Sequence, residues 1–407
     1  MVATYPIDSL ANLYAANTLD AFWHLLVEPQ VSSAEWADAG ESAALILSGV
    51  DAVIGTDIDS TVSAILGEAH FGIKHWQLDR SKRLYYQLKP LVPRNLSILL
   101  RRLYRRRQKM QFTLGWPIED RYVRFQFHCA AHVLGQRGLT SVPYVNFWPH
   151  GHRFALVLTH DIEGERGVAF VEKVADLEER LGFRSVFNFV PERYPVDPNL
   201  LSALRQRGFE IGVHGLNHDG KLFSSKQVFE QRATKINRYL REWEAVGFRA
   251  PYTHRNPEWM QALKIDYDLS FFDTDPYEPI PGGTMSIWPC LLGSFVELPY
   301  TLCQDHTLMV VLGEHSPRLW LDKVDFVERW QGMALVNIHP DYLREQGRLV
   351  IYEEFLRAVK DRGNYWHALP YSVARWWRQR AQFQAQCRNG QWDLSGLPGA
   401  TLSHFLI

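Results

Sequence analysis

The sequence predicts an α/β protein built around a (β/α) barrel of seven or eight units, with an additional, mainly helical N-terminal region. Three observations support this fold class. From residue 153 onward, short apolar runs alternate with longer amphipathic runs over about 220 residues, as expected of parallel βαβ units. The apolar runs are continuous rather than alternating, so both faces of the sheet should be covered. The number of units favours a barrel over an open sheet with the same local pattern.

The elements of the barrel can be placed by their patterns. Strands are expected at the short apolar runs, and helices at the longer amphipathic runs. The expected strands are 154–161, 185–191, 209–215, 248–251, 268–273, 294–300, 333–340 and 364–370. The expected helices are 168–182, 199–208, 223–247 and 372–383.

The chain divides into three expected parts: a partly helical region of unknown role over residues 1–150, the barrel over 151–375, and a tail over 376–407 that packs on the barrel. Helical segments are expected at 19–27 and 42–47. A basic run, RRLYRRRQK, occupies residues 101–109. Such a run is usually a solvated helix face. The alternative is a patch that docks on an anionic polymer or on a polysaccharide-synthesis complex at a membrane.

Composition excludes several classes of function. The net charge of -1 gives no overall attraction to nucleic acid. Four cysteines lack CxxC spacing, which argues against a zinc ribbon or a disulfide framework. No apolar run approaches the roughly 20 residues that a transmembrane helix needs, and the first residues do not form a secretory signal. We therefore expect a soluble, cytoplasmic protein.

Ionisable side chains follow several expected strands at the point where each strand ends. Because the carboxyl ends of parallel strands meet at one rim, these side chains should lie close together. Charged groups are rarely buried unless they are paired or bind a metal, so packing alone does not explain the set. Its members are Asp161 and Glu163 after the first strand, His214 and His218 after the third, Arg249 and Pro251 after the fourth, Asp273 and Asp275 after the fifth, and His339 near the end of a later strand.

These residues predict a metal-dependent hydrolase. His214 and His218 are spaced HxxxH, and a carboxylate from the first strand would complete a facial site for a divalent metal, with zinc, iron, cobalt and nickel all suited to imidazole. An HxxxH pair alone would more often be two unrelated histidines. Of Asp161 and Glu163, one can bind the metal while the other accepts a proton from water. His339 could protonate a leaving amine, or could be a structural histidine.

Five motifs in this order (THDIE, HGLNH, RAP, SFFDTDPYEPIPGG and NIHP) resemble those of the polysaccharide deacetylase (NodB-homology) family of carbohydrate esterases. The resemblance covers residues 154–369 and implies a distorted barrel that binds zinc or a related ion. It departs from the family at position 163, where Glu replaces the usual Asp, and at His160, where Phe or Tyr is commoner. The implied roles are Asp161 as catalytic base, Glu163, His214 and His218 as metal ligands, Arg249 as the residue that orients the base, Asp273 or Asp275 as the partner of Arg249, and His339 as general acid.

The resemblance also implies a substrate. Family members usually remove acetyl groups from N-acetylated sugars, so we expect acetate release from a surface polysaccharide or its precursor. Hydrolysis of another C–N bond, such as a ureide or cyclic amide, and a sugar-binding role without catalysis are the alternatives. The resemblance places an oxyanion-binding N–H near Tyr252. Candidate groove residues are Pro251, Tyr252, Tyr277 and Trp288, although the three aromatic residues are at least as well explained as core.

Overall fold

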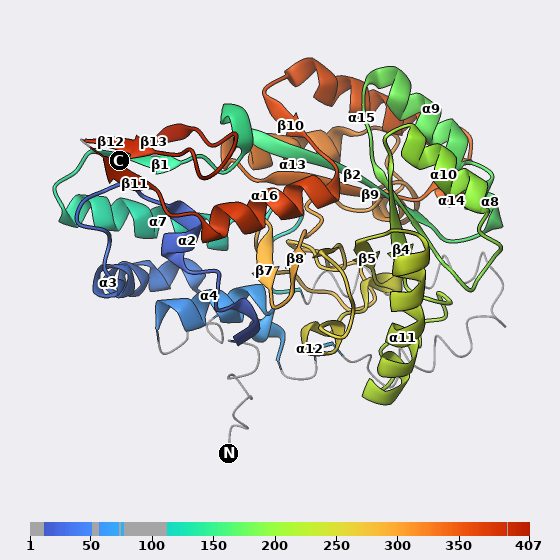
Figure 1. Ribbon diagram of the computed structural model, residues 1–407, viewed down its shortest axis with the longest axis horizontal. Coiled ribbons are helices and arrows are strands. Elements are labelled where there is room, and N and C mark those ends of the chain that lie inside the picture. The colour runs from blue at the N-terminus through green and yellow to red at the C-terminus, as the bar shows by residue number, and fades with distance from the viewer. Residues whose placement is uncertain (1–11, 51–56, 73–74, 77–111, 389) are drawn as a thin grey trace.

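The computed structural model describes residues 12–50, 57–72, 75–76, 112–388 and 390–407 (Figure 1). The basic run at 101–109 therefore lies outside the described residues, and its expected docking role stays a prediction. Within the described residues, no helix is both long enough and apolar enough to cross a membrane.

A curled, mostly parallel sheet forms the centre of the protein (Figure 1). Its strand order is β10-β2-β3-β4-β5-β6-β8-β7, and β9, which lies off this path, also pairs with β2. The bounds are β2 Phe154–Ile162, β3 Val186–Phe189, β4 Glu210–His214, β5 Gly247–Arg249, β6 Tyr267–Asp268, β7 Cys290–Leu292, β8 Phe295–Glu297, β9 Met333–Ile338 and β10 Tyr365–His367.

Irregular backbone closes the sheet into a ring. After β8 the chain forms a single parallel bridge from Tyr300 to Phe272 and another from Leu302 to Val336 of β9. Since β9 pairs with β2, these bridges complete a circuit of parallel strands. The predicted distorted (β/α) barrel is confirmed. The segment expected as strand 268–273 is shorter than predicted, because only Tyr267–Asp268 pairs regularly there.

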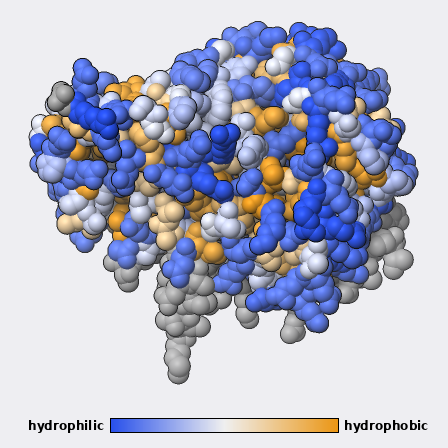
Figure 2. Space-filling view, viewed as in Figure 1, coloured by the Kyte–Doolittle hydropathy of each residue, from blue (hydrophilic) through white to orange (hydrophobic). Residues whose placement is uncertain are grey.

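Amphipathic helices cover the outside of the ring, and their exposed faces are hydrophilic (Figure 2). Apolar residues on the inner faces of α9, α10, α13 and α15 pack on β2, β3 and β9 in one hydrophobic cluster, and those of α11 and α16 belong to a second cluster. Local sequence fixes the ends: Ser225 caps α11 by accepting from the Val228 N–H, and Gly182 ends α9 with a φ of 87°. The helices are α9 Val171–Leu181, α10 Pro198–Gln206, α11 Lys226–Glu242, α13 Arg318–Arg329, α15 Arg348–Arg362 and α16 Pro370–Gln382.

The N-terminal region is mainly helical, as predicted. Ser32 and Glu35 form a capping box at the start of α3, which explains why this helix begins at residue 33. The expected helical segments 19–27 and 42–47 correspond to α2 and to the end of α3 with η1. The elements are α2 Leu19–Trp23, α3 Ser33–Ala43, η1 Ala44–Leu47, α4 Ile58–Leu66, η3 Ala69–Phe71, α7 Arg121–Gln136 and β1 Ser141–Val145.

The C-terminal tail joins the N-terminal region as well as the barrel. Its last strand, β13 (Leu402–Leu406), pairs antiparallel with β1, so the C-terminus lies beside β1 (Figure 1). A hairpin of β11 (Gln386–Arg388) and β12 (Gln391–Asp393) precedes it. The sequence alone does not reveal this pairing, because β1 and β13 are separated by more than 250 residues. One hydrophobic cluster runs through all three parts.

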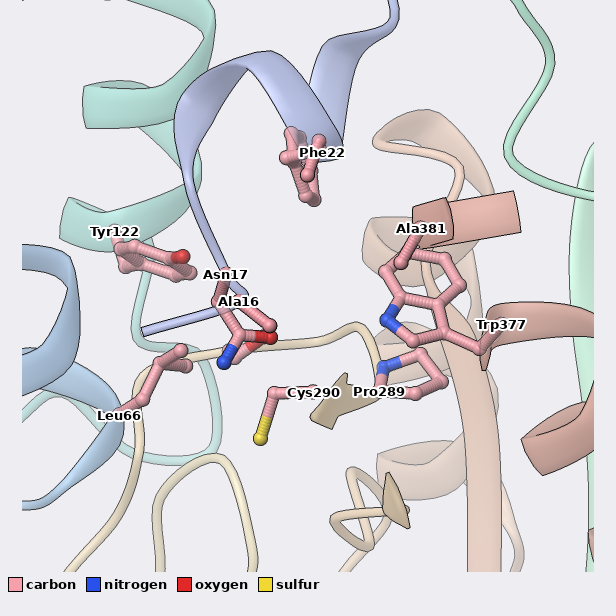
Figure 3. Close-up of a pocket in the computed structure, with 11 residues that line it drawn as sticks. Ala16, Asn17, Phe22, Leu66, Tyr122, Pro289, Cys290, Trp377 and Ala381 are labelled. Atoms are coloured by element: carbon pink, nitrogen blue, oxygen red, sulfur yellow. The ribbon is translucent and has the colours of Figure 1, made fainter. Parts of the chain in front are cut away.

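A small pocket lies where α2, α7, β7 and α16 meet (Figure 3). Its volume is about 20 Å³, and the residues that line it include Asn17, Tyr122, Cys290 and Trp377. A cavity of this size accommodates about one water molecule. It is too small for a sugar ring, so this junction is structural.

A buried ion pair ties the N-terminal region to the barrel near the carboxyl ends of its strands. Glu68 accepts from Arg255 Nη2 at 2.5 Å and from Arg255 Nε at 2.7 Å, and neither side chain is more than 1% exposed. Glu68 also accepts from the Gly283 N–H at 2.7 Å, while Arg255 donates to the Thr253 carbonyl at 3.1 Å. One carboxylate thus holds two loops of the barrel against the N-terminal region.

Replacing Glu68 with Gln leaves the buried Arg255 guanidinium without a counter-charge. We expect the free energy of unfolding to fall by about 3–5 kcal/mol, the usual cost of removing one partner of a buried pair. Chemical denaturation followed by tryptophan fluorescence measures this. The matched control is Glu242→Gln, which disrupts an exposed pair with Arg238 and should leave the transition unchanged. Equal transitions for both variants would show that the Glu68–Arg255 pair does not hold the two parts together.

Candidate active site

The carboxyl ends of β2, β4, β5 and β9 deliver a compact set of polar side chains to one end of the barrel. Strand register brings them together: Asp161 is opposite Asn188, Thr159 is opposite Asn337, and His214 is opposite Arg249 on neighbouring strands. Each of these residues is at most 2% exposed. The polar set therefore forms the interior of the barrel mouth rather than its surface.

Glu163, His214 and His218 form a group whose candidate ligand atoms all lie within 4.8 Å of one another. His214 ends β4, and its Nδ1 lies 3.0 Å from the Arg249 carbonyl oxygen. This contact fixes the ring and leaves Nε2 for a metal ion. Burial lowers the pKa of His214 to about 4, although the nearby Asp161 carboxylate opposes the shift. The ring is thus neutral at physiological pH, as a metal ligand must be.

The geometry of His218 and Glu163 also fits a metal ion. His218 Nε2 lies 3.0 Å from Glu163 Oε1, and among the described residues neither ring nitrogen of this buried histidine has a partner that meets the geometric criteria for a hydrogen bond. Two electron-pair donors that converge without a shared hydrogen bond suit coordination of one cation. Two imidazoles and one carboxylate are a donor set typical of catalytic zinc and related ions.

The loop that carries His218 makes a sharp turn beneath Pro251. Gly215 has a φ of 63°, and a Cβ at this position would lie 2.4 Å from the Pro251 ring. Only glycine fits here. The Tyr252 ring lies against His218, with ring centroids 4.6 Å apart, and Tyr252 itself has a φ of 60°. Pro251 and Tyr252 therefore lie beside the group formed by Glu163, His214 and His218.

Asp161 is the most heavily bonded carboxylate of the site. Its Oδ1 accepts from Asn188 Nδ2 at 3.0 Å and from Arg249 Nη1 at 3.2 Å, and its Oδ2 accepts from Asn337 Nδ2 at 2.8 Å. Burial alone would raise the pKa of Asp161, but the Arg249 guanidinium, the nearby His214 and His339 rings and the Asn337 hydrogen bond bring it well below its ordinary value. Asp161 is held as a fixed anion.

His339 faces Asp161 from the end of β9. Its Nε2 is 3.9 Å from Asp161 Oδ2, the same separation as that between His214 Nε2 and Asp161 Oδ2. On the other side of the ring, Nδ1 lies 2.7 Å from Asp305 Oδ1. Burial opposes the charged ring, but Asp305, Glu163 and Asp161 together raise the pKa of His339 to about 10. The imidazolium can therefore serve as a proton donor.

The structure contradicts the pairing expected for Arg249. Its guanidinium contacts Asp161, Thr159, Asn337 and the Leu269 carbonyl, and neither Asp273 nor Asp275. Asp273 instead forms an ion pair with the buried Lys323 of α13. Asp275 accepts from the Tyr277 N–H at 2.7 Å and from the Tyr300 hydroxyl at 3.1 Å. The prediction failed because the 269–284 loop turns away after β6 and leaves Asp161 as the nearest carboxylate.

One of the expected groove residues lies elsewhere. Trp288 is fully buried, packs on Phe22 and Phe147, and donates to the Gln331 carbonyl, so it belongs to the junction with the N-terminal region. Tyr277 is 6% exposed and packs edge-on against Trp116 at 4.9 Å. The core alternative is correct for Trp288, and the groove role of Tyr277 stays a prediction.

Several residues of the site were not found from the sequence. Asp305 follows an irregular segment, and no motif distinguishes it from other acidic residues. Asn337 stands two positions before His339 in NIHP, and Asn188 is in the centre of the second strand, SVFNFVP. A polar residue inside an otherwise apolar strand was the available signal for both asparagines, because a buried polar group requires a partner.

Comparison with known proteins finds similarity to solved structures only. No protein-family model and no curated protein matches the sequence. Similar solved structures include two proteins provisionally described as polysaccharide deacetylases. The one from Mycobacterium smegmatis has a TM-score of 0.48 and 20% identity, covering 57% of this chain and 92% of that one. The one from Pseudomonas aeruginosa PAO1 has a TM-score of 0.49 and 18% identity, covering 58% and 95%.

A structure of Puue allantoinase is also similar, with a TM-score of 0.46, 16% identity and coverage of 58% of this chain and 94% of that one. Because these TM-scores are below 0.5 and the identities below 25%, none of these likenesses assigns an activity to the chain. Over somewhat more than half its length, the chain is similar to polysaccharide deacetylases and to an allantoinase.

Proposed function

We propose that this protein is a metal-dependent hydrolase that removes the acetyl group from an N-acetylated sugar and releases acetate. The observation that carries the proposal is the arrangement around Asp161. His214, a member of the metal-ligand group Glu163, His214 and His218, and the protonated His339 each place Nε2 3.9 Å from Asp161 Oδ2. A base, a metal site and an acid thus lie together in the interior of the barrel mouth.

Glu163, His214 and His218 would hold a divalent ion, for which zinc is the first candidate and cobalt, nickel and iron are alternatives. When bound, such an ion acidifies water and polarises the acetyl carbonyl. Asp161 accepts the proton of the attacking water, and Arg249 with the two asparagines holds its carboxylate in place. The backbone N–H at Tyr252 is the proposed donor to the oxyanion.

His339 completes the reaction by protonating the leaving nitrogen from Nε2. Asp305 holds the opposite ring nitrogen, Nδ1, so the proton to be transferred is on Nε2, the atom that faces Asp161. An amide nitrogen is a poor leaving group unless it is protonated, and general acid catalysis supplies that step. We retain a surface-polysaccharide precursor inside the cell as the expected substrate, and peripheral docking through residues 101–109 as a separate expectation.

Metal binding by the proposed ligands is tested by elemental analysis. The purified protein should contain close to one divalent transition metal ion per chain, or take up one when zinc is added. The His214→Ala, His218→Ala double variant should contain none, because it retains one ligand of three. The double variant His128→Ala, His132→Ala on α7 is the control and should bind metal normally. A wild-type protein that binds no metal under any condition would refute the proposal.

Asp161→Asn should retain the bound metal but lose catalysis. The amide keeps the shape of the side chain and cannot accept the proton, so we expect acetate release to fall by about 10²–10⁴-fold. Acetate is measured with N-acetylglucosamine oligomers as substrate, beside metal content. Undiminished acetate release by the variant would assign the base to another residue.

Asp305→Asn should lower the pKa of His339 from about 10 toward the ordinary value for histidine, about 6.5. In the metal-free wild type the folded-state pKa is the higher one. The stability that the pair contributes is therefore fully present below about pH 6.5 and is lost as pH rises through about 10. NMR titration of the His339 ring gives the pKa, and unfolding transitions at pH 6, 8 and 10 give the stability. An unshifted titration in the variant would show that Asp305 does not control the acid.

A further inference from the structure

Asp341 stands two residues after His339, in the first turn of α14 (Pro340–Leu343). Its Oδ2 accepts from the Glu163 N–H at 3.0 Å, and its Oδ1 accepts from the Gly167 N–H at 3.0 Å. Each carboxylate oxygen therefore holds one backbone N–H of the segment that leads from β2 into α8 (Glu165–Val168). This side chain is not part of the metal group and has no place in the mechanism above.

The segment that Asp341 contacts has little other support. Regular pairing of β2 ends at Ile162, so the sheet does not fix the backbone at Glu163. The peptide unit between Ile162 and Glu163 is instead held by hydrogen bonds at both its carbonyl oxygen and its N–H. The Tyr194 hydroxyl donates to its carbonyl oxygen, and Asp341 accepts from its N–H. The direction of the Glu163 side chain therefore depends on two contacts from outside the strand.

The fit between Asp341 and this segment is close. A Cβ on Gly167 would lie 2.0 Å from Asp341 Oδ2, and a Cβ on Gly164 would lie 3.4 Å from Asp341 Oδ1. Glycine at 167 thus allows the carboxylate to approach the backbone. Asp341 also belongs to the same short stretch as Asn337 and His339, so this stretch contains the proposed acid and contacts both the base and the segment that carries a metal ligand.

We propose that Asp341 is a positioning residue for the metal site, which holds the backbone of Glu163 so that its carboxylate converges with His214 and His218. The inference rests on the proposed function, because it requires those three residues to bind a metal. Groups that orient the ligands of a metal typically change its affinity by about 10- to 100-fold when they are removed.

The test compares zinc affinity in Asp341→Asn with that of the wild type, by competition with a chromophoric chelator. An amide offers one acceptor oxygen and presents donors to the second N–H, so the dissociation constant for zinc should rise by about 10- to 100-fold. The matched control is Asp325→Asn on α13, an exposed aspartate paired with Arg362, which should bind zinc as the wild type does. Unfolding transitions of the metal-free proteins show whether the change is one of global stability.

The outcomes separate the two proposals. Wild-type affinity in a folded Asp341→Asn variant would overturn the positioning role and leave the proposed function intact. Absence of zinc binding by the wild type would overturn the proposed function, and the positioning role with it. If Asp341→Asn does not fold, Gly167→Ala displaces the same carboxylate without removing it and should weaken zinc binding to a similar extent. Unchanged affinity in that variant would likewise overturn the inference.

Discussion

The contact between Asp161 and Arg249 inside the barrel mouth is the constraint on which the rest of the site depends. Neither side chain is more than 3% exposed, and removing one partner of a buried ion pair is strongly destabilising. Arg249 also donates from Nη1 to Thr159 and Asn337 and from Nε to the Leu269 carbonyl, whereas its Nη2 has no hydrogen-bond partner among the described residues. Through its own carbonyl, Arg249 also orients His214. The position of the base and the orientation of a metal ligand are thus linked through one residue.

The irregular closure of the barrel has a chemical consequence. A regular strand after β8 would continue along the sheet, but the chain here forms only isolated bridges at Tyr300 and Leu302. Three residues later Asp305 reaches His339 and receives its backbone N–H as well as its ring. The π-helix His306–Leu312 begins directly afterwards. The segment that distorts the ring is therefore the one that supplies the charge which keeps His339 protonated.

Much of this arrangement is predictable because it is local. A strand end fixes where a side chain points, so Asp161, His214, His218, Arg249 and His339 could be placed at one rim from the spacing of strands alone. Contacts made by loops were not predictable in this way. Asp273 or Asp275 is the expected partner of Arg249, yet these two residues pair with Lys323 and Tyr300. The 269–284 loop contacts α13 and the N-terminal region, and a local sequence pattern does not contain such contacts.

The contacts that join distant segments also could not be predicted from the sequence. The pairing of β1 with β13 and the buried contact between Glu68 and Arg255 connect residues that no local pattern relates. Trp288 shows the same limit, since an aromatic residue near the motifs could face either a groove or a core. In each case the outcome depends on which residues are buried in the tertiary structure. Short-range sequence periodicity does not carry that information.

The most direct test of the account is the position of the metal ion. Crystals grown with zinc should give an anomalous difference peak between Glu163, His214 and His218, at about 2.0–2.2 Å from the nitrogen and oxygen ligands. We predict such a peak close to Asp161 and His339. Zinc bound elsewhere, with these three side chains left as they are in the metal-free protein, would contradict it.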